Sequence, residues 1–376
     1  MMKNRKKAVW LAAGIAASLG LAACGTGSRK TAGSGKSALD RDELFTSRDL
    51  EQTVNATDAE TITVTDGDDV AIRNEGIYVL RGTAENASVT VDAKGAKVQL
   101  LLDHLSITNK DKAAIVVRKA DKVFITLAEG STNDLAVTDT FRKEGKEKRK
   151  AVIDSEEDIT LNGTGSLHIT SSQGAVHSKK ALSITGGTYT FDTKKTAVKA
   201  EDSIRIKDGT ITITSEDDGL HAEHDSNTEK GYVYIGGGTL NIKAEDDCIF
   251  AIPILQIDDG SLHLNGHEGL EATWIQINGG ALKILARDDG MNANRSAKGH
   301  YSTLAEINGG ELTISLFGKE ADGIDSNGDL VIRGGTLAIS GELAIDIVGD
   351  IRFTGGTVIF NGKEQTDLDS INSAGN

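Results

Sequence analysis

The chain has 376 residues and a mass of 39.6 kDa, with 43 glycines, 1 proline and 4% aromatic residues, so its core is expected to be thin. The single proline, Pro253, excludes a collagen-like chain, and 38% hydrophobic residues in short alternating runs exclude a disordered one. The formal charge of −15 argues against a nucleic-acid-binding protein, because proteins that neutralise phosphates are normally basic.

Residues 1–23 have the pattern of a secretory signal peptide, with basic residues near the start and an uncharged apolar run after them. The run ends in Leu-Ala-Ala-Cys, which resembles a bacterial lipobox, so we expect Cys24 to be lipidated and to become the first mature residue. The expected product is a lipoprotein anchored to the outer face of the cell membrane. The alternative is an ordinary secretory signal, which also leaves the protein exported. Cys248 is the only other cysteine, so no internal disulfide forms once Cys24 is acylated.

Residues 24–38 are rich in glycine and serine and predict a flexible tether. The stretch 40–52 predicts a short amphipathic helix, because the apolar residues at positions 39, 44, 45 and 50 lie roughly on one side of it. We interpret residues 39–58 as an N-terminal cap.

Three short phrases recur along the chain after residue 163. One occurs as GGTLNI at 237 and GGTLAI at 334, another as DDGLHA at 217 and DDGMNA at 288, and the third as YVYIG at 232 and DLVIR at 329. Recurrence at about 20–30 residues indicates a solenoid, and the alternation within each phrase indicates strands. With glycine at the corners, this pattern predicts an all-β parallel β-helix with three short strands per coil, over residues 59–362.

The first half of this domain is less regular but keeps the alternation. The basic stretch RKEGKEKRK at 142–150 is interpreted as a solvated loop, and its alternative is a patch for anionic polymers. The polar tail, residues 363–376, is expected to be disordered.

The second phrase places acidic residues at the same position of successive coils. Stacked carboxylates raise one another's pKa and destabilise a fold unless something compensates, and clustered oxygen ligands suit Ca²⁺ better than Mg²⁺, which prefers a stricter octahedron. The alternative is Asp-Gly turn chemistry, which does not explain the glutamate at 268. We name the acidic ladder Asp218, Asp247, Glu268, Asp289 and Asp322. The further candidate calcium ligands beside it are Asp217, Asp246, Asp288, Glu271, Asn292 and Asp325.

The third phrase places Tyr232, Ile254, Trp274 and Leu304 at one outward position of successive coils, with Tyr234 beside the first. Exposed aromatic rings on a rigid face suit stacking against sugar rings. The alternative is that the insertions at 223 and 294 cover them and form a satellite core. The candidate carbohydrate-binding residues are Tyr232, Tyr234, Trp274, Arg295, Lys298 and Tyr301. His177 and His221 are expected to be exposed rather than metal ligands, because zinc needs converging ligands.

The runs KVQLLLDHLSITN and AAIVVRKADKVFITLAEGSTN, followed by alternating GGTLTI-like and DDGIHA-like phrases, resemble a family of exported carbohydrate-binding β-helix proteins of Gram-positive bacteria. The resemblance implies a right-handed parallel β-helix similar in fold to pectate lyases, bound calcium, and affinity for acidic polysaccharides such as polygalacturonate. Asp218, Asp247, Glu268 and Asp289 match the family's ladder. The chain departs from the family at Cys248, which replaces a glycine, and at the basic loop.

The leading hypothesis is a surface lipoprotein that binds acidic polysaccharide through calcium without cleaving it. The first alternative is a calcium-dependent polysaccharide lyase, with Arg287, Lys283 or Lys298 as the base. Against it, no basic residue recurs in an evident catalytic frame, and a fold alone does not confer activity. The second alternative is a structural adhesin or cell-wall spacer.

Overall fold

The computed structural model describes residues 37–142, 149–294 and 301–374, so the predicted signal peptide, Cys24, Arg295 and Lys298 lie outside the described residues. Within these ranges the only helices are the short 3-10 turns η1 (Arg41–Glu43), η2 (Ser47–Leu50) and η3 (Asp369–Ile371). None of the helices described is long and apolar enough to cross a membrane. The prediction of an all-β protein is confirmed.

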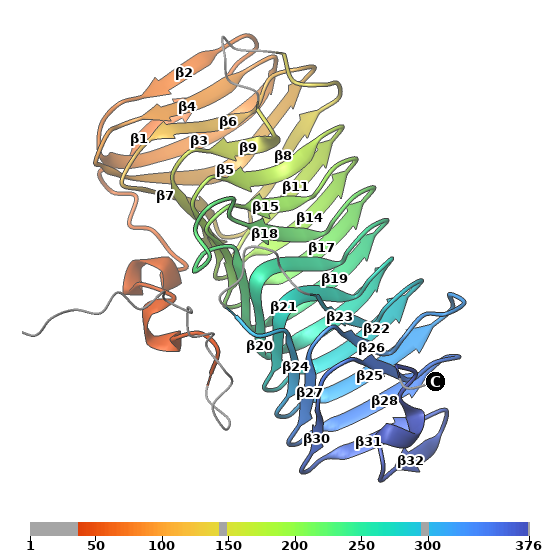
Figure 1. Cartoon of the computed structure of the whole chain (residues 1–376). Helices are drawn as coiled ribbons and strands as arrows, with labels where there is room; N and C mark the ends of the chain where they lie inside the picture. The colour runs from red at the N-terminus through yellow and green to blue at the C-terminus, as the bar shows by residue number, and fades with distance from the viewer. Residues whose placement is uncertain (1–36, 143–148, 295–300, 375–376) are drawn as a thin grey trace, which may run out of the picture.

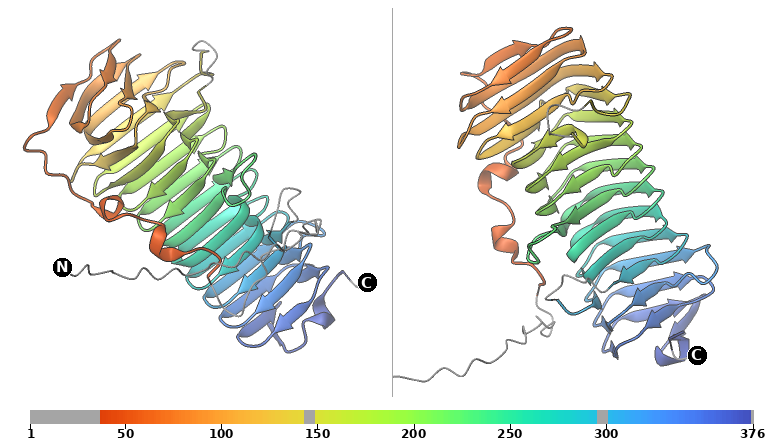
Figure 2. Two further views of the ribbon diagram at one scale, coloured as in Figure 1. Left: turned by 60° about the vertical axis from the view of Figure 1, so that its left-hand side comes forward. Right: turned by 45° about the horizontal axis from the view of Figure 1, so that its top comes forward.

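The strands wind into coils that stack along one axis, as Figures 1 and 2 show. Each strand pairs in parallel with the equivalent strand of the next coil, so that Ile159 aligns with Leu182 and Leu182 aligns with Ile204. Between β7 and β31, most coils contribute three strand segments before the chain returns to the same face. The predicted three short strands per coil are therefore present.

The stack has three faces, which we name the ladder face, the brace face and the open face. The ladder face contains β2 (Asp69–Ile72), β4 (Ser88–Asp92), β6 (Ile115–Lys119), β9 (Ala151–Ser155), β12 (Gly174–Ser178), β15 (Val198–Ala200), β18 (Leu220–Glu223), β23 (Met291–Ala293), β26 (Ile324–Ser326) and β29 (Ile345–Ile347). The brace face contains β1 (Glu60–Thr63), β7 (Lys122–Leu127), β10 (Asp158–Gly163), β13 (Ala181–Ile184), β16 (Ser203–Ile206), β24 (Leu304–Ile307), β27 (Asp329–Ile332) and β30 (Ile351–Phe353). The open face contains β8 (Thr132–Val137), β11 (Ser166–Ser171), β14 (Thr188–Thr193), β17 (Thr210–Ser215), β22 (Ala281–Ala286), β25 (Glu311–Leu316), β28 (Thr336–Ser340) and β31 (Thr357–Phe360).

Five longer strands turn a corner and contribute to more than one face: β3 (Gly76–Glu85), β5 (Lys97–Asn109), β19 (Tyr232–Ala244), β20 (Ile249–Gly266) and β21 (Leu270–Ile277).

Glycine makes the corner between the brace face and the open face possible. Gly280 and Gly310 have φ values of +88° and +90°, which residues with a Cβ rarely adopt. A Cβ on Gly310 would lie 2.9 Å from the carbonyl oxygen of Gly280 on the preceding coil. The recurring double glycine therefore permits both the turn and the close stacking of coils.

The core is a narrow column of aliphatic side chains between the three faces. On the open face Leu262, Leu282, Leu312 and Leu337 occupy consecutive coils in register, and each is at most 1% exposed. Because each coil adds a similar layer, apolar burial grows with the length of the stack and needs few aromatic residues.

The N-terminal segment differs from the prediction. In place of an amphipathic helix, residues 40–52 form the two turns η1 and η2, and η2 begins with a capping box between Thr46 and Asp49. The segment 37–52, which we name the brace, runs along the outside of the brace face (Figure 2). The Leu39 backbone N–H donates to Gln256 Oε1 at 2.8 Å, and Gln52 Nε2 donates to the Thr185 carbonyl at 3.0 Å. The interpretation of this segment as a cap over the end of the solenoid is therefore wrong.

The described part of the C-terminal tail, residues 363–374, is ordered, which corrects the expectation of disorder. Strand β32 (Lys363–Gln365) pairs antiparallel with β31, and Leu368 is buried against the core. Ser373 Oγ donates to the Ile345 carbonyl at 3.0 Å. The tail therefore covers the last coil with polar and turn-forming residues, as a solenoid end requires.

Candidate functional site

The five residues of the acidic ladder occupy the same position of successive coils, as the sequence predicted. Parallel pairing aligns Leu220, Ile249, Leu270, Met291 and Ile324 on five consecutive coils of the ladder face. The ladder residues each precede one of these positions by two, so they stack in the same order. One residue after the aligned positions, the side chains in register are His221, Phe250, Glu271, Asn292 and Asp325.

Three of these carboxylates converge. One oxygen each from Asp247, Glu268 and Glu271 lies within 4.8 Å of the others. Two oxygens bound to one Ca²⁺ lie at most about 5 Å apart, because each lies about 2.4 Å from the ion. Two further groups in the described residues meet the same distance limit, namely Asp217, Asp218 and Asp246, and His267, Glu268 and Asp288. The histidine makes the last group less suited to calcium, which prefers oxygen ligands.

The electrostatics of the ladder are unfavourable without a compensating charge. Burial, together with the negative charges of Glu268 and Glu271, raises the pKa of Asp247 to about 9. Burial and the charge of Glu271 raise the pKa of Glu268 to about 8. Burial also raises the pKa of Asp289 to about 7 and the pKa values of Asp322 and Asp325 to about 6, with neighbouring aspartates as the second cause.

Two buried oxygens of this region have no hydrogen-bond partner among the residues that the structure describes. They are Glu268 Oε2 and Asn292 Oδ1, although Asn292 Nδ2 donates to Glu268 Oε1 at 3.0 Å. A buried acceptor without a partner costs about 1–3 kcal/mol. Acceptor oxygens without donors, next to carboxylates, are a donor set that fits a calcium ion. The oxygen ligands that these residues offer therefore fit a calcium site.

The turn-chemistry alternative holds for part of the ladder. Asp289 Oδ1 accepts the backbone N–H of Asp322 at 2.9 Å, and Asp218 Oδ1 accepts the backbone N–H of Asp247 at 3.3 Å. His221 Nδ1 lies 2.7 Å from Asp218 Oδ2. These aspartates connect one coil to the next. Hydrogen bonds between coils therefore explain part of the recurrence of aspartate at this position of the repeat.

The aromatic stripe has the predicted register but not the predicted exposure. Ile254, Trp274 and Leu304 align on consecutive coils, yet Trp274 is 7% exposed. They form a small cluster with Tyr301 and Val331, and Leu39 of the brace packs against it. Trp274 Nε1 donates to Glu306 Oε2 at 3.2 Å, which satisfies the indole inside the cluster. The interpretation of Trp274 as an exposed sugar platform is wrong, and the satellite-core alternative describes it.

The tyrosines are covered as well. Tyr234 is 5% exposed, packs against Phe45 of the brace and donates to Asp258 Oδ2 at 3.0 Å. Tyr301 is buried and donates to Glu229 Oε2 at 3.0 Å, so the insertions at 223 and 294 contact each other. Tyr232 is half-buried beside the same cluster. Tyr234 and Tyr301 therefore do not form the exposed surface that the sequence predicted.

Of the residues considered as the base of a lyase, Lys283 and Arg287 lie within the described residues. Lys283 lies in β22 on the open face, in register with His263. Arg287 is next to Asp288, but its Nη2 donates to the backbone carbonyl of Glu245 at 2.5 Å and lies 3.4 Å from that residue's carboxylate. Lys298 lies outside the described residues.

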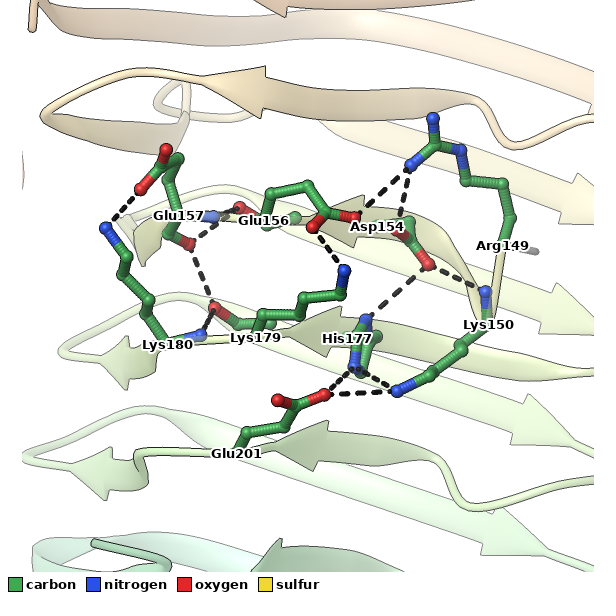
Figure 3. Close-up of polar contacts among 11 residues, drawn as sticks. Arg149, Lys150, Asp154, Glu156, Glu157, His177, Lys179, Lys180 and Glu201 are labelled. Atoms are coloured by element: carbon green, nitrogen blue, oxygen red, sulfur yellow. Dashed lines mark hydrogen bonds and ion pairs between the residues drawn. The ribbon is translucent and has the colours of Figure 1, made fainter. Parts of the chain in front are cut away.

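A charged network on the earlier coils of the ladder face was not predicted from the sequence. His177 is 2% exposed, which corrects the expectation that it is exposed, and its Nδ1 lies 3.5 Å from Asp154 Oδ2 (Figure 3). Lys150 Nζ lies 3.2 Å from His177 Nε2 and 3.2 Å from Glu201 Oε1. Arg149 Nη1 donates to Asp154 Oδ1 at 3.3 Å. The sequence contains one sign of this network. VIDS and AVHS are two successive copies of the second phrase, and both have a polar residue, Asp154 and His177, at the same position.

Comparisons with known proteins agree with the fold. A family model described as "Carbohydrate-binding domain-containing protein" matches residues 66–273 and 265–367. A protein of the same description from Acetivibrio thermocellus is 32% identical over 264 residues, which cover 69% of this chain and 91% of that protein. A solved structure entitled "polysaccharide lyase-like protein from C. thermocellum, Gadolinium derivative" has a TM-score of 0.50 and 28% identity, over 60% of this chain and 94% of that one.

Proposed function

The chain belongs to the family of carbohydrate-binding domain-containing proteins, and we propose that it binds acidic polysaccharide through calcium held at the acidic ladder, without cleaving the polymer. We also propose that the stacked coils form a right-handed parallel β-helix. We also propose that the mature protein is exported and attached by lipidated Cys24 to the outer face of the cell membrane.

The observation that carries the calcium proposal is the convergence of Asp247, Glu268 and Glu271 around acceptor oxygens without donors. Asp247, Glu268 and Glu271 would hold the ion, with Asn292 Oδ1 as a neutral oxygen ligand. When bound, calcium supplies positive charge that attracts the carboxylate groups of a uronate polymer. The solved neighbour is a gadolinium derivative, and gadolinium, like calcium, is a cation that prefers oxygen ligands.

The chain's own residues position this site rigidly. Glu271 and Asn292 project from β21 and β23, and Asp247 and Glu268 lie in the turns that lead into β20 and β21. Backbone hydrogen bonds join these turns from coil to coil, since the Cys248 N–H donates to the Glu268 carbonyl at 3.1 Å, so the backbone sets the spacing of the carboxylates. Strand spacing places successive ligands about 4.8 Å apart along the axis. A linear polymer that lies along the axis would therefore meet several equivalent positions.

The runner-up function is a polysaccharide lyase, because the solved neighbour is named lyase-like. The positions of Lys283 and Arg287 favour binding without cleavage, since Lys283 projects from another face and Arg287 is engaged with Glu245. Ultraviolet absorbance of unsaturated uronate products, recorded with polygalacturonate and calcium, separates the two functions.

The test of the proposed function is a calorimetric titration of calcium, followed by polygalacturonate, into the wild-type protein and into Asp247→Asn/Glu268→Gln. We expect the wild type to bind calcium and then polymer, and the variant to bind neither with the same affinity. Equal calcium affinity in both proteins would exclude the ladder as the site. The matched control is Glu311→Gln, which removes an exposed acid from the open face.

A further inference from the structure

A hollow of about 670 Å³ lies on the ladder face, several coils before the acidic ladder. Its wall is formed by residues of β2, β4 and β6 and by both ends of the segment around the basic loop, Arg142 and Arg149. No part of the acidic ladder reaches it. The hollow is therefore separate from the proposed calcium site, although both lie on the same face.

The charged side chains that line this hollow are mainly cationic. Among the described residues, five basic side chains and two acidic side chains contribute to the lining. Lys112 is paired with the acid Asp69 at 2.6 Å, and Arg149 with Asp154 outside the lining. Arg73, Arg118 and Arg142 are exposed. The lining residues with charge are Arg73, Lys112, Arg118, Arg142, Arg149, Asp69 and Asp92.

Small outward side chains create the space between these cations. Ala71, Thr90 and Val116 occupy the same outward position on three consecutive coils. On the next coil the position is taken by Asp154, whose carboxylate contacts Arg149 and the Lys150 backbone N–H. The side chains at the bottom of the hollow are therefore small and uncharged, and the basic residues surround them.

A second hollow of about 280 Å³ continues the first toward the ladder, with Arg149 in the wall of both. Its lining includes Lys150, Lys195 and Lys199, and none of the described residues that line it is acidic. Figure 3 shows Lys150 and His177 together at this place. The outward position of Val116 and Asp154 continues through His177 and Lys199 to His221.

The same outward position then becomes acidic. After His221 it is occupied by Phe250, Glu271, Asn292 and Asp325 on successive coils. One face of the stack therefore has a cationic region over its earlier coils and an anionic region over its later coils. A net charge of −15 conceals this division.

We propose that the two hollows form one cationic cleft that binds the carboxylate groups of an acidic polysaccharide directly, without a metal ion. This inference deepens the proposed function and rests on it, because the ligand is the same class of polymer. Arginine forks pair with planar carboxylates in bidentate fashion, and the cleft offers several of them around a floor that leaves room for a sugar ring.

The test uses the exported chain without its lipid, with polygalacturonate as the probe and uncharged dextran as the neutral polymer. Binding is measured in EDTA, which removes calcium, and again in calcium. We expect wild-type protein to bind polygalacturonate in EDTA, and added salt to weaken that binding. We expect Arg73→Glu/Arg118→Glu to lose about tenfold or more of the affinity in EDTA, because two attractive charges become repulsive.

The matched control is Lys207→Glu/Lys243→Glu, which makes the same change of charge at exposed positions outside the cleft. A second variant, Arg73→Gln/Arg118→Gln, removes the same charges without reversing them, in case charge reversal prevents folding. Calcium-dependent binding that is retained in either variant shows that the ladder is intact. An equal loss in the control, or wild-type binding that EDTA abolishes, would overturn the cationic cleft and leave the proposed function standing. Absence of binding in both EDTA and calcium would overturn both.

Discussion

At the scale of single residues, the ladder combines acids that stabilise the fold with acids that oppose it. Asp218 and Asp289 each accept a backbone N–H from the next coil. Asp247 and Glu268 instead have strongly raised pKa values because burial and like charges disfavour their ionised forms. Residues kept at such a cost are candidates for binding rather than for stability.

Glu268→Gln is expected to raise the melting temperature of the calcium-free protein and to reduce the stabilisation that calcium gives. The substitution removes one of three crowded carboxylates, which relieves repulsion but also removes a ligand oxygen. Differential scanning calorimetry in EDTA and in calcium measures both effects. A variant that is less stable in EDTA and responds to calcium as the wild type does would contradict this role, and Glu311→Gln serves as the control.

Trp274→Ala is expected to destabilise the protein by about 3–5 kcal/mol, because it leaves a cavity in the cluster beneath the brace and removes a donor to Glu306. Polysaccharide affinity of the folded variant should not change. Denaturant unfolding and polymer binding measured on the same preparation separate the two effects. A stable variant with weakened binding would restore the indole as a sugar-binding surface.

The sequence predicted the register of Trp274 but not its burial. Alternation along β21 correctly showed that Trp274 points out of the aliphatic core. What covers it comes from Leu39, more than two hundred residues earlier, and from Tyr301 in an insertion. Local periodicity carries no information about contacts of that range, so the exposed platform and the satellite core were indistinguishable from sequence.

At the scale of elements, the brace explains why the outward side chains of the brace face are polar and yet buried. Gln256 and Gln276 are fully buried and accept backbone N–H groups from Leu39 and Ala38. Thr160 Oγ1 donates to Asp49 Oδ1 at 2.5 Å. The brace therefore supplies the partners that these buried polar groups need.

Asp49→Asn is expected to destabilise the protein by about 2 kcal/mol near neutral pH. Burial alone would raise the pKa of Asp49, but hydrogen bonds from Lys122, Thr160 and Thr46 outweigh it and lower the pKa from 3.8 to about 2. A depressed folded pKa contributes stability above the unfolded value, and this stability is lost as pH falls from about 4 to 2.

The measurement is denaturant unfolding of the wild type and Asp49→Asn over that acidic range and at neutral pH. The difference in free energy of unfolding between the two proteins should shrink as the pH falls. A difference that stays constant with pH would show that the charge of Asp49 is not what attaches the brace.

The sequence mispredicted this element because its apolar residues satisfied a helical spacing. Leu44 and Phe45 do face the protein, but the hydrogen bonds of η2 are made to Asp49 and Thr46 side chains rather than along a continuous helix. The polar residues that receive the brace lie on coils scattered across the sequence. The apolar residues of the segment therefore indicated that it packs on the solenoid, but not which coils it contacts.

At the scale of the whole molecule, a repeated strand phrase predicts the stack well because each coil repeats the same contacts. The all-β class, the three strands per coil and the alignment of Asp247 with Glu268 followed from spacing alone. The two ends of the stack and the cationic cleft did not, because both depend on segments outside the repeat. Arg73 and Arg118 come from the less regular coils, where the phrases are hardest to align.

The ladder predicts how stability depends on pH. The folded pKa values of Asp247, Glu268 and Asp289, about 9, 8 and 7, lie above their ordinary values, so the folded state binds more protons than the unfolded state in this range. Their contribution to the free energy of unfolding is greatest at low pH and is lost as pH rises toward 9. Calcium should remove this loss, because bound metal replaces the protons.

Melting temperatures recorded from about pH 5 to pH 9 should therefore fall in EDTA and fall much less in calcium. The same pH slope in both conditions would show that calcium does not displace the ladder protons. The Asp247→Asn/Glu268→Gln variant is the matched comparison, and its slope in EDTA should be shallower than that of the wild type.

The most direct test of the central claim is thermal unfolding of the exported domain in EDTA, in calcium, and in calcium with polygalacturonate. A calcium-bound polysaccharide-binding protein is predicted to melt higher in calcium and higher again with the polymer, because each ligand binds only the folded state. Both increments should be lost in Asp247→Asn/Glu268→Gln. A melting temperature that is the same in EDTA and in calcium would contradict the claim and would leave the ladder acids as turn and coil contacts.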